Sequence, residues 1–221
     1  MDITHRIEEL REWMSREHLD AFIFPSTDPH NSEYTPERWK GREWVSGFNG
    51  SAGTAVVTMT GAALWTDSRY FLAAADRLKG TEFRLMRLKM EGTPTIAQWI
   101  GQELREKNGG EVGIDGMVCA TQNVESLMAD LRHEGGITLR TNSDPLATIW
   151  TNRPVIPSDK VVIHPLDYAG ETAAAKIDRV RKALREKHAD GMLVSALDDV
   201  AWTLNLRGSD VHCNPVFVAY L

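Results

Sequence analysis

Long apolar runs, signal-like segments and paired cysteines are all missing from this chain of 221 residues. No run of about 18 apolar residues occurs, so no transmembrane helix is expected. The first residues include the charged Asp2 and Arg6 and no apolar core, which argues against a secretory signal peptide. The two cysteines, Cys119 and Cys213, lie far apart and form no CxxC pair. A reduced, cytoplasmic setting is the simplest interpretation.

An excess of positive charge and the common catalytic motifs are missing too. The formal net charge of −6 argues against nucleic acid or an anionic membrane as a partner. The seven histidines are scattered without an HExxH pair, and no GxSxG occurs. The glycine-rich segment 47–53 precedes an expected strand, whereas a phosphate-binding loop follows a strand and opens a helix. We therefore expect its glycines to serve a positive φ or a close backbone approach, not a nucleotide.

The patterns that are present indicate an α/β fold. Residues 54–58 and 62–66 are β-rich runs separated by Thr60-Gly61, which predicts a β-hairpin. Short apolar strands are expected at residues 21–24, 83–88, 112–114 and 137–139, with amphipathic helices between them. Asp67 or Ser68 is expected to cap the helix that follows the hairpin, and Thr93 the helix that begins at Pro94.

A proline-rich stretch divides the chain. Pro154, Pro157 and Pro165 lie close together, which disfavours a helix and favours a linker. We predict one domain over residues 1–152, a linker at 153–160 and the first part of a second domain at 161–221.

The second domain repeats the opening of the first. The segment 186–191 (Glu-Lys-His-Ala-Asp-Gly) matches 16–21 (Arg-Glu-His-Leu-Asp-Ala), and each follows a helix and precedes an apolar run. Residues 204–209 likewise echo 46–51. This order predicts an internal repeat of one α/β domain, with residues 192–194 as the strand that matches 22–24.

The last eight residues, 214–221, form an apolar run that predicts a strand without a following turn. A strand needs a neighbour for its backbone hydrogen bonds. We therefore expect the chain to be an N-terminal part of a longer protein, with the second domain truncated.

One charged residue lies at an unfavourable place. Arg69 falls at the expected start of a helix, where the helix dipole disfavours a positive charge. This position predicts an anionic partner for Arg69, which is either a carboxylate of the same fold or a group on another domain, subunit or ligand.

Several segments resemble aminopeptidase P, the Xaa-Pro aminopeptidase of the creatinase/prolidase superfamily, in its long three-domain form. The resemblance lies in PSTDPHNSEY at 25–34, VSGFNGSAGT at 45–54, LWTDSRYF at 64–71, IWTNRP at 149–154, and ALDDVAW, NLRGSD and NPVF between residues 196 and 217. It implies two related N-terminal domains, each a mixed β-sheet flanked by helices. A C-terminal catalytic "pita-bread" domain, absent here, would follow them.

The same resemblance implies an activity for the parent protein. The family hydrolyses the first peptide bond of peptides with proline in second position, using two divalent metal ions, usually manganese, held by residues of the catalytic domain. We therefore expect no cofactor and no catalytic residue in this portion, and we expect it to be inactive alone. Proline-containing peptides are the expected substrates of the parent, and a homodimer is the expected assembly.

The family's architecture also implies which residues of this portion could shape the mouth of the active site. The candidates are Arg69, Tyr70, Arg207, Asp210, His212 and Asn214. For each of them the competing interpretation is maintenance of the fold, since Arg207-Gly208-Ser209-Asp210 is also typical of a hydrogen-bonded turn. Two other functions stay open: a catalytically silent relative that binds a partner, and a self-contained small-ligand domain. The apolar run at 214–221 counts against the latter.

Overall fold

A computed structural model describes residues 2–107 and 109–221 of the chain. Its contacts divide the chain into two compact units. The first unit comprises Met1–Pro29 and Trp39–Pro154, and the second comprises His30–Arg38 and Val155–Leu221.

The described residues of the first unit contain a mixed six-stranded sheet in the order β4-β3-β2-β1-β5-β6. Strands β1 to β3 are antiparallel neighbours, while β4, β5 and β6 join in parallel. The strands are β1 (Ala21–Pro25), β2 (Thr54–Thr58), β3 (Ala62–Thr66), β4 (Phe83–Arg87), β5 (Gly110–Ile114) and β6 (Ile137–Arg140). The predicted hairpin is confirmed with its predicted bounds, and so is the predicted fold class of a mixed sheet flanked by helices.

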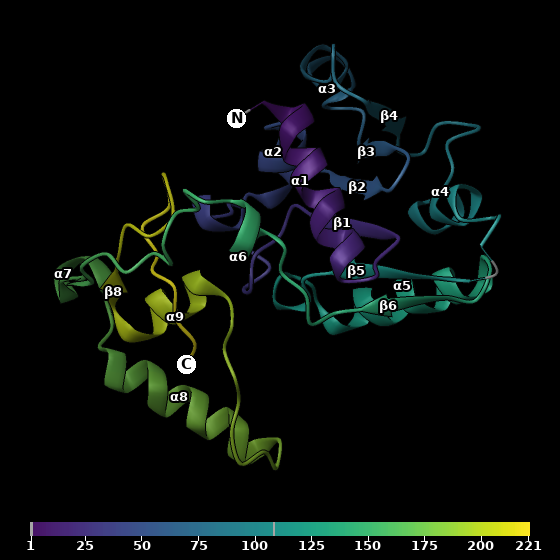
Figure 1. The fold of residues 1–221 in the computed structure, drawn as a ribbon. Coiled ribbons are helices and arrows are strands. Elements are labelled where there is room, and N and C mark those ends of the chain that lie inside the picture. The colour runs from purple at the N-terminus through teal and green to yellow at the C-terminus, as the bar shows by residue number, and fades with distance from the viewer. Residues whose placement is uncertain (1, 108) are drawn as a thin grey trace. The chain divides into compact units, whose positions relative to one another are not determined.

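Helices cover both faces of this sheet (Figure 1). They are α1 (Ile3–Arg16), α2 (Gly41–Ser46), α3 (Phe71–Arg77), α4 (Ile96–Glu103), α5 (Thr121–His133) and α6 (Leu146–Ile149), and 3₁₀ turns lie at η1 (Glu37–Trp39) and η2 (Gly116–Val118). Side chains of a strand alternate between faces. Phe22 and Phe24 of β1 therefore pack with α1, α2, α3 and α6, whereas Ala21 and Ile23 pack with α4 and α5.

The second unit is mostly helical. It contains α7 (Leu166–Ala169), α8 (Ala173–Glu186) and α9 (Leu197–Leu204), and a short ribbon in which β7 (Val162–Ile163) pairs antiparallel with β8 (Leu206–Arg207). A small core joins Leu197, Val200 and Ala201 of α9 to Val211, Val216 and Phe217.

Each unit contains a long helix that ends with the same backbone conformation. Helices α1 and α8 each end before a histidine in the left-handed conformation, His18 at φ 58° and His188 at φ 54°. In both cases the amide of the next residue donates a hydrogen bond to a carbonyl five residues earlier. The Leu19 N–H donates to the Met14 carbonyl at 2.9 Å, and the Ala189 N–H donates to the Leu184 carbonyl at 3.0 Å. These are the bonds of a Schellman motif. Helices α2 and α9 also end alike, at Gly47 (φ 72°) and Asn205 (φ 52°). The predicted repeat is confirmed at both junctions.

Some local predictions are wrong. Helix α4 begins two residues later than predicted, because Thr95 and Gln98 form a reciprocal capping box. Neither Asp67 nor Ser68 caps α3, whose preceding residue is Tyr70. In the second unit, the predicted strands at 192–194 and 214–221 are extended segments without strand assignment. Val194 and Leu221 exchange backbone bonds of 2.7 and 3.1 Å, and the carbonyls of Pro215 and Val216 accept the amides of Gly208 and Asp210, both at 3.3 Å.

Candidate functional site

Two hollows in the second unit share the residues Asp198 and Asn214. Helix α9 supplies one side of both and carries Asp198 and Asp199 in its first turn, where the helix dipole favours negative charge. The loop from β8 to Phe217 supplies Asn214. This arrangement brings together the segment 196–217 and the polar segment 30–34, both of which were singled out by the resemblance.

The larger of the two, which we call the Trp202 hollow, has a volume of about 600 Å³. It is lined by Asp198, Asp199, Trp202, Arg207, Asn214 and Pro215, among others. The Trp202 side chain is half-exposed, at 46%. The guanidinium of Arg207 donates to the carbonyls of Ala201 and Leu206, at 3.2 and 2.8 Å, which fixes this side chain against the end of α9. The hollow thus combines an aromatic face with groups of both charges.

The smaller one, the His30 hollow, has a volume of about 210 Å³. Its walls are residues 30–34 on one side and Ala196, Leu197, Asp198, Val211 and Asn214 on the other. The His30 ring is buried and stacks on Tyr220, with ring centroids 4.3 Å apart. Asp198 and Asn214 lie in both linings, so these two residues join the hollows.

The predicted site residues of the second unit divide into two groups. Arg207 and Asn214 line the Trp202 hollow. Asp210 lines neither hollow among the described pockets, and its carboxylate accepts the backbone amides of Asp159 and Val218, both at 2.8 Å. His212 is exposed and also lies outside both linings. Geometry therefore favours fold maintenance for Asp210, and it brings only Arg207 and Asn214 together.

In the first unit, Arg69 has its carboxylate partner two residues away. Its guanidinium pairs with Asp67 at 2.9 and 2.8 Å and lies 5.3 Å from the centre of the Tyr70 ring. The hydrogen bonds from Arg69 lower the pKa of Asp67. Of the two partners left open for Arg69, a carboxylate of the same fold is the one the structure shows.

Tyr70 closes the glycine-rich loop. Its hydroxyl lies 2.7 Å from the Ser51 hydroxyl, and this hydrogen bond lowers the pKa of the Tyr70 phenol. The predicted roles of the glycines are confirmed, since Gly47 has φ 72° and a Cβ on Gly53 would lie 2.8 Å from the Trp65 carbonyl. Tyr70 thus contacts the glycine-rich loop directly, and Arg69 lies over the Tyr70 ring.

Arg42, which the sequence did not reveal, holds the base of that loop. It is buried on α2 and donates to the carbonyls of Phe48 and Gly50 and to the Ser26 hydroxyl. Burial lowers its pKa to about 10. No local pattern identifies such a residue, because its partners are set by the fold of the loop.

Within residues 2–107 and 109–221, no group of three or more His, Cys, Asp or Glu side chains is placed to hold a metal ion. None of the helices in those residues combines the length and apolar character needed to cross a membrane.

The family models for the creatinase/prolidase N-terminal domain match residues 6–143 and again residues 152–221. The chain therefore belongs to the creatinase/prolidase N-terminal domain family.

Individual relatives define the resemblance further. All 221 residues align with probable Xaa-Pro aminopeptidase P of Paracoccidioides brasiliensis (strain Pb18) at 39% identity and with that of Talaromyces marneffei at 41%. The chain covers 35% and 33% of those proteins. It also matches the crystal structure of X-prolyl aminopeptidase from Caenorhabditis elegans, described as a cytosolic enzyme with a di-nuclear active site. That match has a TM-score of 0.88 and 30% sequence identity. It covers the whole of this chain and 37% of the Caenorhabditis elegans chain. The predicted resemblance to an N-terminal portion of aminopeptidase P is confirmed, and the chain spans about a third of its relatives' length.

Proposed function

We propose that this chain is a non-catalytic N-terminal region of a metal-dependent Xaa-Pro aminopeptidase. The observation that carries the proposal is the whole-length similarity to Xaa-Pro aminopeptidase P. The parent would cleave the bond before a proline in second position, with two divalent metal ions, manganese by our expectation, held outside these residues. The lack of a metal-ligand group in the described part of the chain agrees with this division of labour.

The role proposed for this region is to shape substrate access. The Trp202 and His30 hollows support it, because an open surface with an aromatic face, an arginine and carboxylates can hold a peptide's backbone and termini. Arg207 and Asn214 are the residues to which we assign this role. Arg69 and Tyr70 are proposed for the same role in the first unit. Asp210 and His212 stay weaker candidates, since neither lines a hollow.

Two further proposals concern the setting of the parent. A homodimer is supported by apolar side chains of the second unit, since Val155 and Ile163 are each 80% exposed and Tyr168 is 79% exposed. A cytoplasmic location is supported by the description of the Caenorhabditis elegans relative as cytosolic and by the free thiols of Cys119 and Cys213.

A titration by nuclear magnetic resonance tests the access role on the chain itself. A tripeptide with proline in second position is added to isotope-labelled protein up to about 5 mM, because an access surface binds weakly. We expect shifts at the Asn214 side-chain amide, the Trp202 indole and the Arg207 guanidinium. Asn214→Ala should abolish them, while Cys213→Ala, on the same loop but outside the hollows, should leave them unchanged. Uniform shifts, or none, would reject this role.

A further inference from the structure

Strand β4 is one of the two edge strands of the six-stranded sheet. It stands first in the order β4-β3-β2-β1-β5-β6 and pairs in parallel with β3. The Leu88 amide donates to the Thr66 carbonyl of β3 at 3.0 Å. Because alternate residues of a parallel strand bond to the same neighbour, the backbone groups of Leu85 and Arg87 point away from β3. We call this outward side of Phe83–Arg87 the β4 edge.

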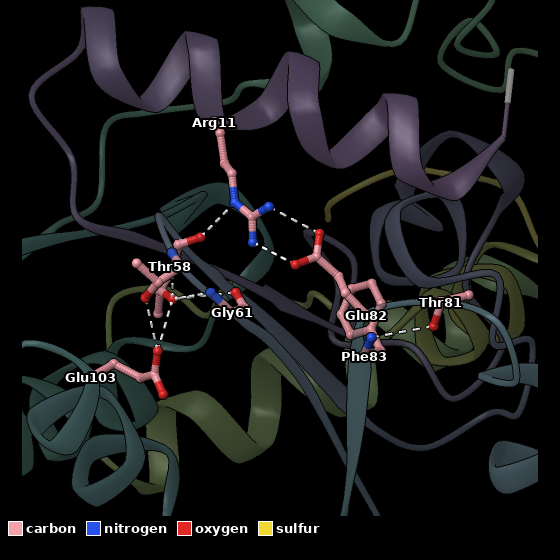
Figure 2. Close-up of polar contacts among 8 residues, drawn as sticks. Arg11, Thr58, Gly61, Thr81, Glu82, Phe83 and Glu103 are labelled. Atoms are coloured by element: carbon pink, nitrogen blue, oxygen red, sulfur yellow. Dashed lines mark hydrogen bonds and ion pairs between the residues drawn. The ribbon is translucent and has the colours of Figure 1, made fainter.

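The middle of the β4 edge is open. Among the described residues, the N–H and C=O of Leu85 and the N–H of Arg87 have no hydrogen-bond partner. The two ends are closed, since the Phe83 amide donates to the Thr81 hydroxyl at 3.2 Å (Figure 2) and the Met90 amide donates to the Arg87 carbonyl at 3.1 Å. The open stretch is therefore short and centred on Leu85, and backbone groups of this kind can pair with an added strand.

Three basic side chains lie along this edge and just after it. Residues 83–90 (Phe-Arg-Leu-Met-Arg-Leu-Lys-Met) include Arg84, Arg87 and Lys89 and no carboxylate, in a chain whose formal net charge is −6. All three side chains are exposed, and none of them forms an ion pair with a described residue. The Arg87 guanidinium lies 5.7 Å from the centroid of the Phe71 ring, which holds it beside α3. The edge is thus locally positive.

The nearby carboxylates do not neutralise this charge. Glu82, immediately before β4, accepts two hydrogen bonds from Arg11 of α1, at 3.0 and 2.7 Å (Figure 2). Asp67 pairs with Arg69 at 2.8 Å. Glu91, which follows the basic stretch, is exposed and forms no ion pair within the described residues. The fold therefore leaves the arginines of the β4 edge available to a carboxylate from outside.

The opposite edge of the sheet uses its basic residue differently. Arg140 of β6 donates from Nε to the Glu111 carboxylate at 2.8 Å and from Nη2 to the Glu17 carbonyl at 3.0 Å, so it is engaged within the fold. Free positive charge on β4 disfavours pairing of two identical edges, because like charges would lie opposite each other. The same charge favours a strand of opposite sign.

We propose that the β4 edge binds an extended acidic segment of a partner protein as an added antiparallel strand. One residue of the segment exchanges both backbone hydrogen bonds with Leu85. Residues directly opposite each other share a face of the sheet, so the residues opposite Arg84 and Arg87 are acidic. The two residues between them lie opposite the half-buried Leu85 and Met86 and are apolar. The recognised pattern is thus acid-apolar-apolar-acid. This surface belongs to the first unit and does not depend on the peptidase proposal.

Binding of a short peptide to the whole chain tests the proposal. The probe is the capped peptide Thr-Glu-Val-Val-Glu-Thr, added to isotope-labelled protein up to about 5 mM because a short strand binds weakly. Nuclear magnetic resonance should show saturable shifts centred on the Leu85 and Arg87 amides. Arg84→Glu and Arg87→Glu should each weaken binding about threefold, and the double variant about tenfold. Arg132→Glu, at an exposed position of α5, is the matched charge reversal and should bind as the wild type does.

Two modified peptides distinguish strand addition from charge attraction alone. Methylation of the second valine amide removes the N–H that would bond to the Leu85 carbonyl and leaves the charge unchanged, so binding should fall at least about tenfold. Replacement of both glutamates by lysine should abolish binding to the wild type. The same lysine peptide should bind the variant that carries both Arg84→Glu and Arg87→Glu, because the charges are then complementary again.

Four results would overturn the proposal. The first is the absence of saturable shifts with the acidic peptide. The second is equal binding of the methylated peptide, since charge alone would then attract the segment. The third is equal binding of the acidic and lysine peptides, or of the edge variants and the Arg132→Glu control. The fourth is a dimer in sedimentation experiments whose dissociation on dilution shifts the Leu85 amide, since the occupant would then be a second copy of the chain.

Discussion

The ammonium group of Lys176 lies 4.1 Å from the centroid of the Trp202 ring and donates a 2.8 Å hydrogen bond to the Trp202 carbonyl. The first unit holds the same pair, in which the Arg6 guanidinium lies 5.0 Å from the Trp44 ring and donates to the Trp44 carbonyl at 2.6 Å. In each unit a basic residue of one helix, α1 or α8, thus contacts a tryptophan of another, α2 or α9. The repeat therefore extends from the chain path to individual side-chain contacts.

Replacing Lys176 should destabilise the second unit selectively. Lys176 is 2% exposed and also donates to Asn205 Oδ1 at 2.7 Å, so Lys176→Met leaves this buried acceptor without its donor, while the Trp202 carbonyl keeps the Asn205 amide at 3.3 Å. We expect a loss of about 2 kcal/mol in free energy of unfolding, because each unsatisfied buried acceptor costs about 1–3 kcal/mol. Urea unfolding measures the change. Lys182→Met on the exposed face of α8 should have almost no effect, and a similar loss in both variants would contradict this role of Lys176.

The glycine of the Arg-Gly-Ser-Asp turn is required for close packing. A Cβ on Gly208 would lie 2.6 Å from the Phe217 Cβ and 3.0 Å from the Val216 carbonyl. Gly208→Ala should therefore cost about 2 kcal/mol, the usual range for overpacking. Gly191→Ala is the control, because nothing lies within 4 Å of its added methyl group. Thermal melts of the two variants should differ clearly, and equal melting temperatures would show that the turn tolerates a side chain.

Asp115 should give the first unit a pH-dependent stability. Burial raises its pKa, and Asp144 adds to this effect. The folded state thus holds the proton more tightly than the unfolded state. The resulting destabilisation is complete above the folded pKa and disappears as the pH falls below the unfolded pKa of about 3.9. Asp115→Asn keeps an oxygen for the Met117 amide, so this variant should be more stable than wild type at pH 7, and the difference should shrink as the pH falls toward 4.

The control for this pH dependence is Asp130→Asn, on the exposed side of α5. This variant removes a carboxylate of the same charge from an exposed position. If Asp115→Asn is less stable than wild type at pH 7, or if its difference does not change with pH, burial of Asp115 is not what sets this dependence.

Hydrogen exchange should distinguish the two equivalent helices. The inner face of α1 is fully covered, whereas that of α8 lines an open groove. Amides of Ile177 and Val180 should therefore exchange at least about tenfold faster than those of Ile7 and Leu10, because local opening of α8 exposes little new apolar surface. Equal protection in both helices of a monomeric sample would show that α8 is stabilised without a cover.

Much of the first unit follows from local sequence patterns. The hairpin at Thr54–Thr58 and Ala62–Thr66 was predicted with its bounds, because β-rich runs and Thr60-Gly61 are adjacent in the sequence. The start of α4 was missed, since the capping box of Thr95 and Gln98 outweighs a proline at Pro94. The strands expected in the second unit did not form, because a strand needs a continuous ladder of hydrogen bonds, and the backbone bonds between 192–194 and 214–221 in the described residues join Val194 to Leu221.

The candidate site could be predicted only in part. Motif segments pointed to Arg207 and Asn214, which line one hollow, but also to Asp210, whose carboxylate is engaged by the amides of Asp159 and Val218. Sequence order alone cannot separate a turn-forming carboxylate from one that faces a hollow. Arg42 was missed for a similar reason, because its hydrogen bonds to Phe48 and Gly50 depend on how the glycine loop folds.

The central claim, that this region carries no peptidase chemistry of its own, is tested most directly by an activity assay. The 221-residue chain, purified free of other peptidases, is incubated with Mn²⁺ and a peptide that has proline in second position, and release of the first residue is measured. We predict no release above the protein-free blank, because no metal-ligand group is formed by the described residues. Manganese-dependent release that co-purifies with the chain and disappears with a chelator would contradict the account.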